Sequence, residues 1–222
     1  MKKLIDLSHS VEDGMVTYKG LPAPLICDFL TREASKAYYA EGTTFHIGKI
    51  EMVANTGTYL DSPFHRYADG KDLSELPLDS IAELEGLVFR ADSAHSSIGP
   101  ELFEGSDVSG KAVLVHTGWD RHWRSDRYFE GHPYLSAAAA EWLKDAGATL
   151  VGIDSYNIDA TSTGDRPVHS ILLGADVPIV EHLCHLDRLP EADQPGSPFM
   201  FNAVPVKIKK FGTFPVRAYA VV

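Results

Sequence analysis

The segment Asp61-Ser62-Pro63-Phe64-His65 places a carboxylate and an imidazole four residues apart, with a proline between them. Pro63 excludes a regular helix interior and favours a turn, so both polar side chains can leave a strand end in one direction. There they could bind a divalent metal ion or act as an acid–base pair. The same residues also fit a simpler interpretation, an Asx-type turn with a surface histidine.

A second candidate pair consists of His169 and Glu181. His169 follows Arg166-Pro167, and Glu181 follows the apolar residues 175–180, which are predicted to form a buried strand. Binding sites of α/β folds gather at the ends of strands. Alternatively, Glu181 begins a helix, where a negative charge suits the helix dipole.

Glu181 also opens the cluster EHLCH, which contains His182 and His185. On a helix, Glu181 and His185 would share a face. The order differs from the His-Glu-x-x-His zinc signature, so the cluster is a weak metal signal. No Gly-x-Ser-x-Gly elbow or phosphate-binding Gly-rich loop is present, and Cys27 and Cys184 lack a motif typical of a nucleophile.

The elements that would position these residues are mostly strands. A helix is predicted over residues 137–144, with Ser136 as N-cap and Gly147 as the stop signal. Two shorter helices are expected, one starting near Ser80 and one over residues 170–173. Apolar runs bounded by polar or glycine residues predict strands at residues 3–7, 45–54, 86–91, 112–115, 149–153, 175–180 and 217–222. The uneven alternation favours a mixed α/β fold over a simple doubly wound sheet.

Length and charge exclude several classes of protein. The 222 residues suggest a single domain, 1–222. Because 31 acidic residues stand against 20 basic ones, binding to nucleic acid or to an anionic membrane is not expected. With two cysteines, no long apolar run and no signal-peptide core, the expected location is the cytoplasm.

The motif at residues 55–65, NTGTYLDSPFH, resembles the signature His-x-Gly-Thr-His-x-Asp-x-Pro-x-His of the cyclase family of metal-dependent hydrolases. Bacterial kynurenine formamidase and isatin hydrolase belong to that family. Further matches follow in order, at residues 5–9 (IDLSH), 113–119 (VLVHTGW), 151–154 (VGID), 169–181, 201–206 and 215–218. The resemblance implies an α/β domain in which a mixed sheet curls into a partial barrel with outer helices.

The chain departs from the signature at two positions, where Asn55 and Tyr59 replace histidines that bind metal in the family. Family members with two ions use these histidines and the aspartate for one ion. The second ion uses the same aspartate with a late histidine and glutamate, which correspond here to Asp61, His169 and Glu181. The resemblance therefore implies one divalent ion, Zn or Mn, or none.

The reaction implied by the resemblance is hydrolysis of a small amide, formamide or cyclic imide. His65 would act as general base and then as general acid, and Tyr59 would donate a hydrogen bond to the developing oxyanion. Asn55 could offer its carbonyl oxygen to metal or substrate. Candidate pocket residues are Tyr18, Phe64 and Trp119, each of which also fits a plain core position.

Two other interpretations remain open on the sequence alone. A metal-free relative could bind a small ligand, or catalyse lactone hydrolysis, dehydration or cyclisation through His65 and Tyr59. A structural or interaction protein with no site is the third. The resemblance also implies a homodimer or homotetramer, in which the N-terminal segment helps to close a neighbour's pocket.

Overall fold

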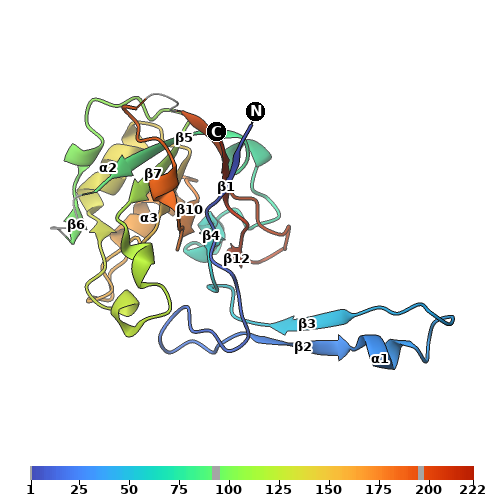
Figure 1. Cartoon of the computed structure of the whole chain (residues 1–222). Coiled ribbons are helices and arrows are strands. Elements are labelled where there is room, and N and C mark those ends of the chain that lie inside the picture. Colours follow the sequence, from blue (N-terminus) through green and yellow to red (C-terminus); the bar gives the residue numbers. More distant parts are fainter. Residues whose placement is uncertain (1, 92–95, 195–197) are drawn as a thin grey trace.

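The computed structural model describes residues 2–91, 96–194 and 198–222. The protein is built around a central mixed sheet. Its strands lie in the order β1-β13-β11-β5-β7-β9-β10-β4-β12 and curl around the middle of the molecule (Figure 1). The strands are β1 (Leu4–Asp6), β4 (Tyr59–Asp61), β5 (Leu84–Arg90), β7 (Ala112–His116), β9 (Leu150–Ile153), β10 (Ile179–Glu181), β11 (Phe199–Asn202), β12 (Thr213–Pro215) and β13 (Tyr219–Val221). This is the curled mixed sheet that the family resemblance implied, and that prediction is confirmed.

The middle of the sheet is parallel and carries the core. Strands β5, β7, β9 and β10 pair in parallel, and every residue of β7 is buried. Because side chains alternate along a strand, Val113 and Val115 face one core cluster while Ala112 and Leu114 face the other. The continuous apolar run at residues 112–115 is typical of a parallel strand covered on both faces.

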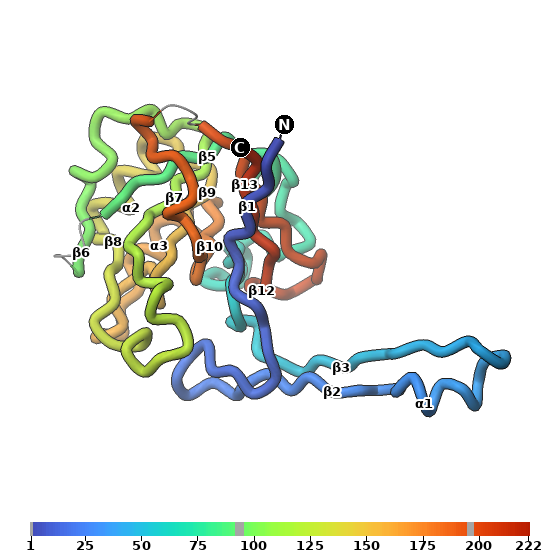
Figure 2. The backbone as a smooth tube through the Cα atoms, in the orientation of Figure 1, coloured from blue at the N-terminus to red at the C-terminus, as the bar shows by residue number. Residues whose placement is uncertain are grey.

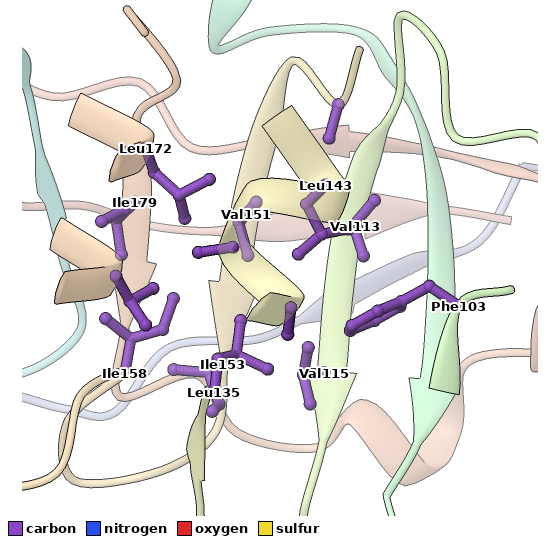
Figure 3. Close-up of a cluster of buried hydrophobic side chains, with 14 of the residues drawn as sticks. Phe103, Val113, Val115, Leu135, Leu143, Val151, Ile153, Ile158, Leu172 and Ile179 are labelled. Atoms are coloured by element: carbon purple, nitrogen blue, oxygen red, sulfur yellow. The ribbon is translucent and has the colours of Figure 1, made fainter. Parts of the chain in front are cut away.

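Two helices, α2 (Ala137–Asp145) and α3 (Pro167–Gly174), cover one face of the sheet. Leu143 of α2 and Leu172 of α3 point toward Val113, Val151 and Ile179 on the strands (Figure 3). This packing fixes α3 against β10, its contact partner in the sheet. Among the described residues, no helix has the length and apolar character needed to cross a membrane.

The predicted helix over 137–144 is confirmed, because the Ser136 hydroxyl accepts the Ala139 N–H at 3.1 Å and Gly147 ends it with a φ of +81°. The short helix expected over residues 170–173 lies inside α3. The helix expected near Ser80 is wrong: only a 3-10 turn, Leu78–Ser80, is present. The chain leaves this turn through Glu83, whose φ is +51°, and enters β5 directly.

The strand expected over residues 45–54 forms outside the central sheet. Strand β3 (Ile47–Glu51) pairs antiparallel with β2 (Leu25–Leu30), and α1 (Arg32–Ser35) lies between them in sequence. Together residues 25–51 form an arm that extends away from the body (Figures 1 and 2). Every residue of β3 is exposed, so this strand contributes nothing to the core. A small parallel pair, β6 (Ser97–Ile98) and β8 (Tyr134–Leu135), lies on the opposite side of the molecule.

Candidate functional site

Five of the predicted site residues meet beside β4 and β10. These neighbouring strands are antiparallel, so Tyr59 stands directly opposite Glu181 in the register. Asp61 ends β4, His65 lies in the 3-10 turn that follows it, and His169 lies in the first turn of α3. Residues separated by more than a hundred positions in the sequence therefore share one site.

The simpler interpretations do not hold for Asp61 and Glu181, although His65 is exposed, as the simpler interpretation expected. Asp61 is completely buried, which excludes a surface turn as its role. Glu181 is the last residue of β10 and begins no helix. The EHLCH segment is not helical, because His182 and His185 both have φ near +57° (56° and 58°), so Glu181 and His185 share no helix face.

The imidazole of His169 is held by Asp159, which lies in the loop before α3. The Asp159 carboxylate hydrogen-bonds Nδ1 of His169 at 2.6 Å and accepts the backbone N–H groups of Val168 and His169 at 2.8 and 3.0 Å. These bonds leave Nε2 of His169 facing Asp61 Oδ2 at 3.7 Å and Glu181 Oε1 at 3.8 Å. A carboxylate on the far nitrogen is typical of metal-binding histidines.

The charges in this cluster depend on one another. Burial disfavours a charged His169, but its bonds to Asp159 and Asp61 and the charge of Glu181 raise its pKa to about 10. Burial also raises the pKa of Glu181, against the opposing effect of His169. Without a metal ion, protonated His169 thus supplies the positive charge that the two buried carboxylates require.

The residues fit a divalent metal ion. Oδ2 of Asp61 is buried without a hydrogen-bond partner, which is costly for a carboxylate oxygen unless a cation neutralises it. Nε2 of His169 lies 3.7 Å from Asp61 Oδ2 and 3.8 Å from Glu181 Oε1. Each of these distances suits two atoms that bind the same metal ion at about 2 Å. Among the described residues, Asp61, His65 and His169 form the group whose ligand atoms all lie within 4.8 Å of one another, while Glu181 joins the cluster through His169.

His65 is linked to Asp61 by a residue that sequence reasoning missed, Thr213 of β12. The Thr213 hydroxyl donates to Asp61 Oδ1 and lies 2.7 Å from Nδ1 of His65. Because the hydroxyl proton is given to Asp61, Nδ1 must carry a hydrogen and donate to Thr213. The other nitrogen, Nε2, is then free to accept a proton. No sequence pattern marked Thr213. In the fold, the preceding Gly212 allows the close approach, since a Cβ there would lie 2.4 Å from the backbone N of His65.

The two replaced histidine positions differ in their surroundings. The buried Tyr59 hydroxyl donates to Glu181 Oε2 at 2.5 Å. Burial, with the charges of Glu181 and Asp61, raises the pKa of Tyr59 well above its usual value, so the phenol stays protonated. Asn55 lies on the wall of the adjacent pocket.

This pocket has a volume of about 420 Å³ and is lined by His65, His169 and Glu181 as well as by Tyr59 and Asn55. Of the predicted substrate residues, Tyr18 lines it, and its hydroxyl accepts a hydrogen bond of 2.6 Å from Asn157.

Phe64 and Trp119 are not among the described residues that line the pocket. Trp119 instead packs in the buried cluster that contains Tyr128 and Tyr156. Its Nε1–H donates to the Tyr128 carbonyl at 3.0 Å. Phe64 is half-buried, and its backbone N–H donates to the Lys71 carbonyl at 3.0 Å, in the turn that follows β4.

Comparison with known proteins agrees with this architecture. Kynurenine formamidase from Geobacillus thermodenitrificans is 29% identical over 220 residues, which cover 98% of this chain and 97% of that protein. Kynurenine formamidase from Bacillus anthracis is 25% identical over 217 residues, covering 97% and 96%.

Among solved structures, isatin hydrolase A from Labrenzia aggregata has a TM-score of 0.82 at 20% identity. The likeness covers 100% of this chain and 94% of that one. A potential metal-dependent hydrolase with cyclase activity has a TM-score of 0.79 at 23% identity, covering 100% and 98%. At these identities the likeness shows a shared fold.

The family model described as putative cyclase matches residues 5–160. This range includes residues 55–65, where Asn55 and Tyr59 replace two histidines of the signature. That match spans more than half of the chain, and the relatives match almost all of it. The resemblance seen in the sequence is therefore confirmed, and the chain belongs to the cyclase family of metal-dependent hydrolases.

Proposed function

We propose that this protein hydrolyses the C–N bond of a small amide, formamide or cyclic imide with the help of one divalent metal ion. The observation that carries the proposal is the unpartnered Asp61 Oδ2, buried 3.7 Å from Nε2 of His169, which lines a pocket together with His65. The named relatives are kynurenine formamidases over almost the whole chain, which supports amide hydrolysis as the reaction class.

Asp61, His169 and Glu181 are the ligands we propose, with Zn or Mn as the ion. One imidazole and two carboxylates suit either metal and leave a coordination position open. Such an ion, when bound, polarises a carbonyl and makes water more acidic. The proposal of a single ion rests on the absence of the two signature histidines, replaced by Asn55 and Tyr59.

His65 is the proposed proton carrier. Its Nδ1 is engaged with Thr213, so Nε2 is the atom that takes a proton from the attacking water. The same nitrogen then returns the proton to the leaving amine as the C–N bond breaks, giving a carboxylic acid and an amine. Tyr59 holds Glu181 in place, and the oxyanion role expected from the sequence would require this hydrogen bond to break.

We further propose a homodimer or homotetramer, in which the arm of residues 25–51 packs against a second copy. Large apolar side chains are exposed along it, including Phe29, Tyr38 and Ile50. A reducing compartment such as the cytoplasm is the proposed location, because Cys27 and Cys184 are both free thiols.

The test of the proposed function is metal content per chain, measured by plasma mass spectrometry on protein purified without chelator or affinity tag. We expect about one equivalent of Zn or Mn in the wild type and its loss in His169→Ala and Glu181→Ala. The matched control is His46→Ala, which removes a histidine on the arm. A wild type that stays metal-free after both ions are added would overturn the proposal and favour a metal-free relative.

His65→Ala separates the two possible ligand sets. If His65 carries protons, this variant keeps its metal and loses amide hydrolysis. If the metal is lost as well, the ion is held by the alternative set with His65, and the assignment of His65 as base is wrong.

A further inference from the structure

Two arginines line the pocket that contains the proposed metal ligands. Arg66 directly follows His65, and Arg166 directly precedes α3. Both also line an adjoining hollow of about 450 Å³, together with Ser170. The pocket and this hollow therefore share both arginines.

Hydrogen bonds hold both arginines in place. Ser170 connects them, since its hydroxyl accepts from Arg66 Nε at 3.1 Å and donates to the Arg166 carbonyl at 2.8 Å. One terminal nitrogen of Arg166 donates to three backbone carbonyls, those of Ala160, Thr163 and Asp165, at 3.1, 2.8 and 2.7 Å. The remaining N–H groups of both guanidiniums have no partner among the described residues and can bind a ligand.

The charge of these arginines is not neutralised within the described part of the chain. No carboxylate there lies within 4.0 Å of either guanidinium, although the sequence has 31 acidic residues against 20 basic ones. Asp165 lines the outer hollow without forming an ion pair with Arg66 or Arg166. In a protein of formal charge −11, two uncompensated cations at a pocket mouth create a local site for an anion.

We infer that the substrate carries a carboxylate, which Arg66 and Arg166 bind at the pocket mouth while the scissile amide lies beside His65. This inference rests on the proposed function, because it assigns the substrate class of the same site. A planar guanidinium binds a carboxylate through paired hydrogen bonds, which gives orientation as well as affinity. Tyr18 and Leu21, which also line the pocket, suit an aromatic or apolar body in such a substrate.

The test compares matched substrates that differ in one charge. The probes are 2-, 3- and 4-formamidobenzoate, each with the corresponding neutral formamidobenzamide. We expect kcat/KM of the wild type to be at least about tenfold higher for the acid in one or more pairs. Arg66→Gln and Arg166→Gln should bring that ratio close to one, and Arg166→Lys should restore part of it.

The control is Arg188→Gln, which removes an exposed arginine that does not line the pocket and should leave the ratio unchanged. If all three neutral amides are hydrolysed as well as their acids, the carboxylate inference is wrong and the hydrolase proposal stands. The same conclusion follows if the ratio survives both glutamine variants.

If no probe is hydrolysed, the proposed function fails for these amides, and calorimetry then decides the inference separately. Binding of 2-aminobenzoate would be compared with that of 2-aminobenzamide in the wild type and in Arg166→Gln. Tighter binding of the acid that is lost in the variant supports the carboxylate site. Equal binding of the two compounds, or a preference that Arg166→Gln leaves intact, overturns it.

Discussion

At the scale of single residues, Thr213 is the connection on which the proposed chemistry most depends. Thr213→Val keeps the branched shape but removes the hydroxyl that links His65 to Asp61. We expect kcat to fall by about 10- to 100-fold, because the ring of His65 loses its fixed tautomer and orientation. Metal content should stay near that of the wild type, since Thr213 is not a proposed ligand.

Thr213→Ser is the matched control for this prediction, because serine restores the hydroxyl without the methyl group. Activity close to that of the wild type is expected for the serine variant. If the valine variant retains full activity, His65 does not need the hydrogen bond, and its assignment as proton carrier loses its structural basis.

The raised pKa of His169 leads to a prediction about metal affinity. In the metal-free protein the imidazole is protonated up to a pH of about 10, so a cation must displace that proton. Apparent affinity should therefore rise with pH, about tenfold per unit from pH 7 to 9 for one displaced proton. Competition with a chromophoric chelator measures it, with the chelator's own protonation subtracted. An affinity independent of pH would show that His169 binds the ion without losing a proton.

The same raised pKa makes the stability of the metal-free protein depend on pH. Because the folded pKa of about 10 lies above the usual 6.5, the proton on His169 stabilises the fold fully below pH 6.5. This contribution is lost as the pH rises through about 10. Bound metal replaces the proton, so the loss at alkaline pH should be smaller in the metal-loaded protein when both are followed by thermal unfolding.

At the scale of elements, the ends of β7 and β9 are tied by Asp154. Its buried carboxylate accepts the N–H of Thr117 at 2.7 Å, the Thr117 hydroxyl at 2.6 Å and the N–H of Gly118 at 2.8 Å. Asp154→Ala leaves these donors unpaired in the interior, so we expect the free energy of unfolding to fall by about 2–4 kcal/mol. Urea denaturation measures it, with the exposed Asp79→Ala as control. A change below about 0.5 kcal/mol, typical of surface positions, would contradict the assigned role.

The sequence predicted well those elements whose local residue pattern reflects their burial or marks their ends. The run at residues 112–115 is apolar throughout because β7 is covered on both faces, and the 137–144 helix has its own cap and stop signal. Strands β4 and β12 have only three residues each, and β12 contains a proline, so periodicity could not identify them.

The candidate site shows the same limit. Asp61, His65, His169 and Glu181 could be selected because their residue types fit a known signature. Thr213 and Asp159 could not be assigned, because a threonine or an aspartate becomes informative only when the fold brings it to a particular imidazole. These contacts depend on tertiary packing, which no local spacing encodes.

At the scale of the whole molecule, the arm of residues 25–51 is the feature that a single copy leaves unexplained. Phe29 and Tyr38 are 74% and 75% exposed, and apolar surface of this kind is typical of an interface. Sedimentation at micromolar concentration should give at least twice the chain mass of 24.3 kDa. Phe29→Ser combined with Tyr38→Ser should shift the mass toward one chain, whereas Leu78→Ser, at an exposed apolar position off the arm, should not. A wild type that sediments as a single chain would contradict the proposal.

The cross-strand pairing of Tyr59 with Glu181 has a consequence for how this chain can vary in length. Successive side chains of a strand point to opposite faces, so inserting or deleting one residue in β4 or β10 would turn its carboxylate away from the pocket. The number of residues in β4 and in β10 is therefore fixed by the site. Within one copy the tip of the arm extends away from the body (Figure 2), so a change in its length would leave this strand register unchanged.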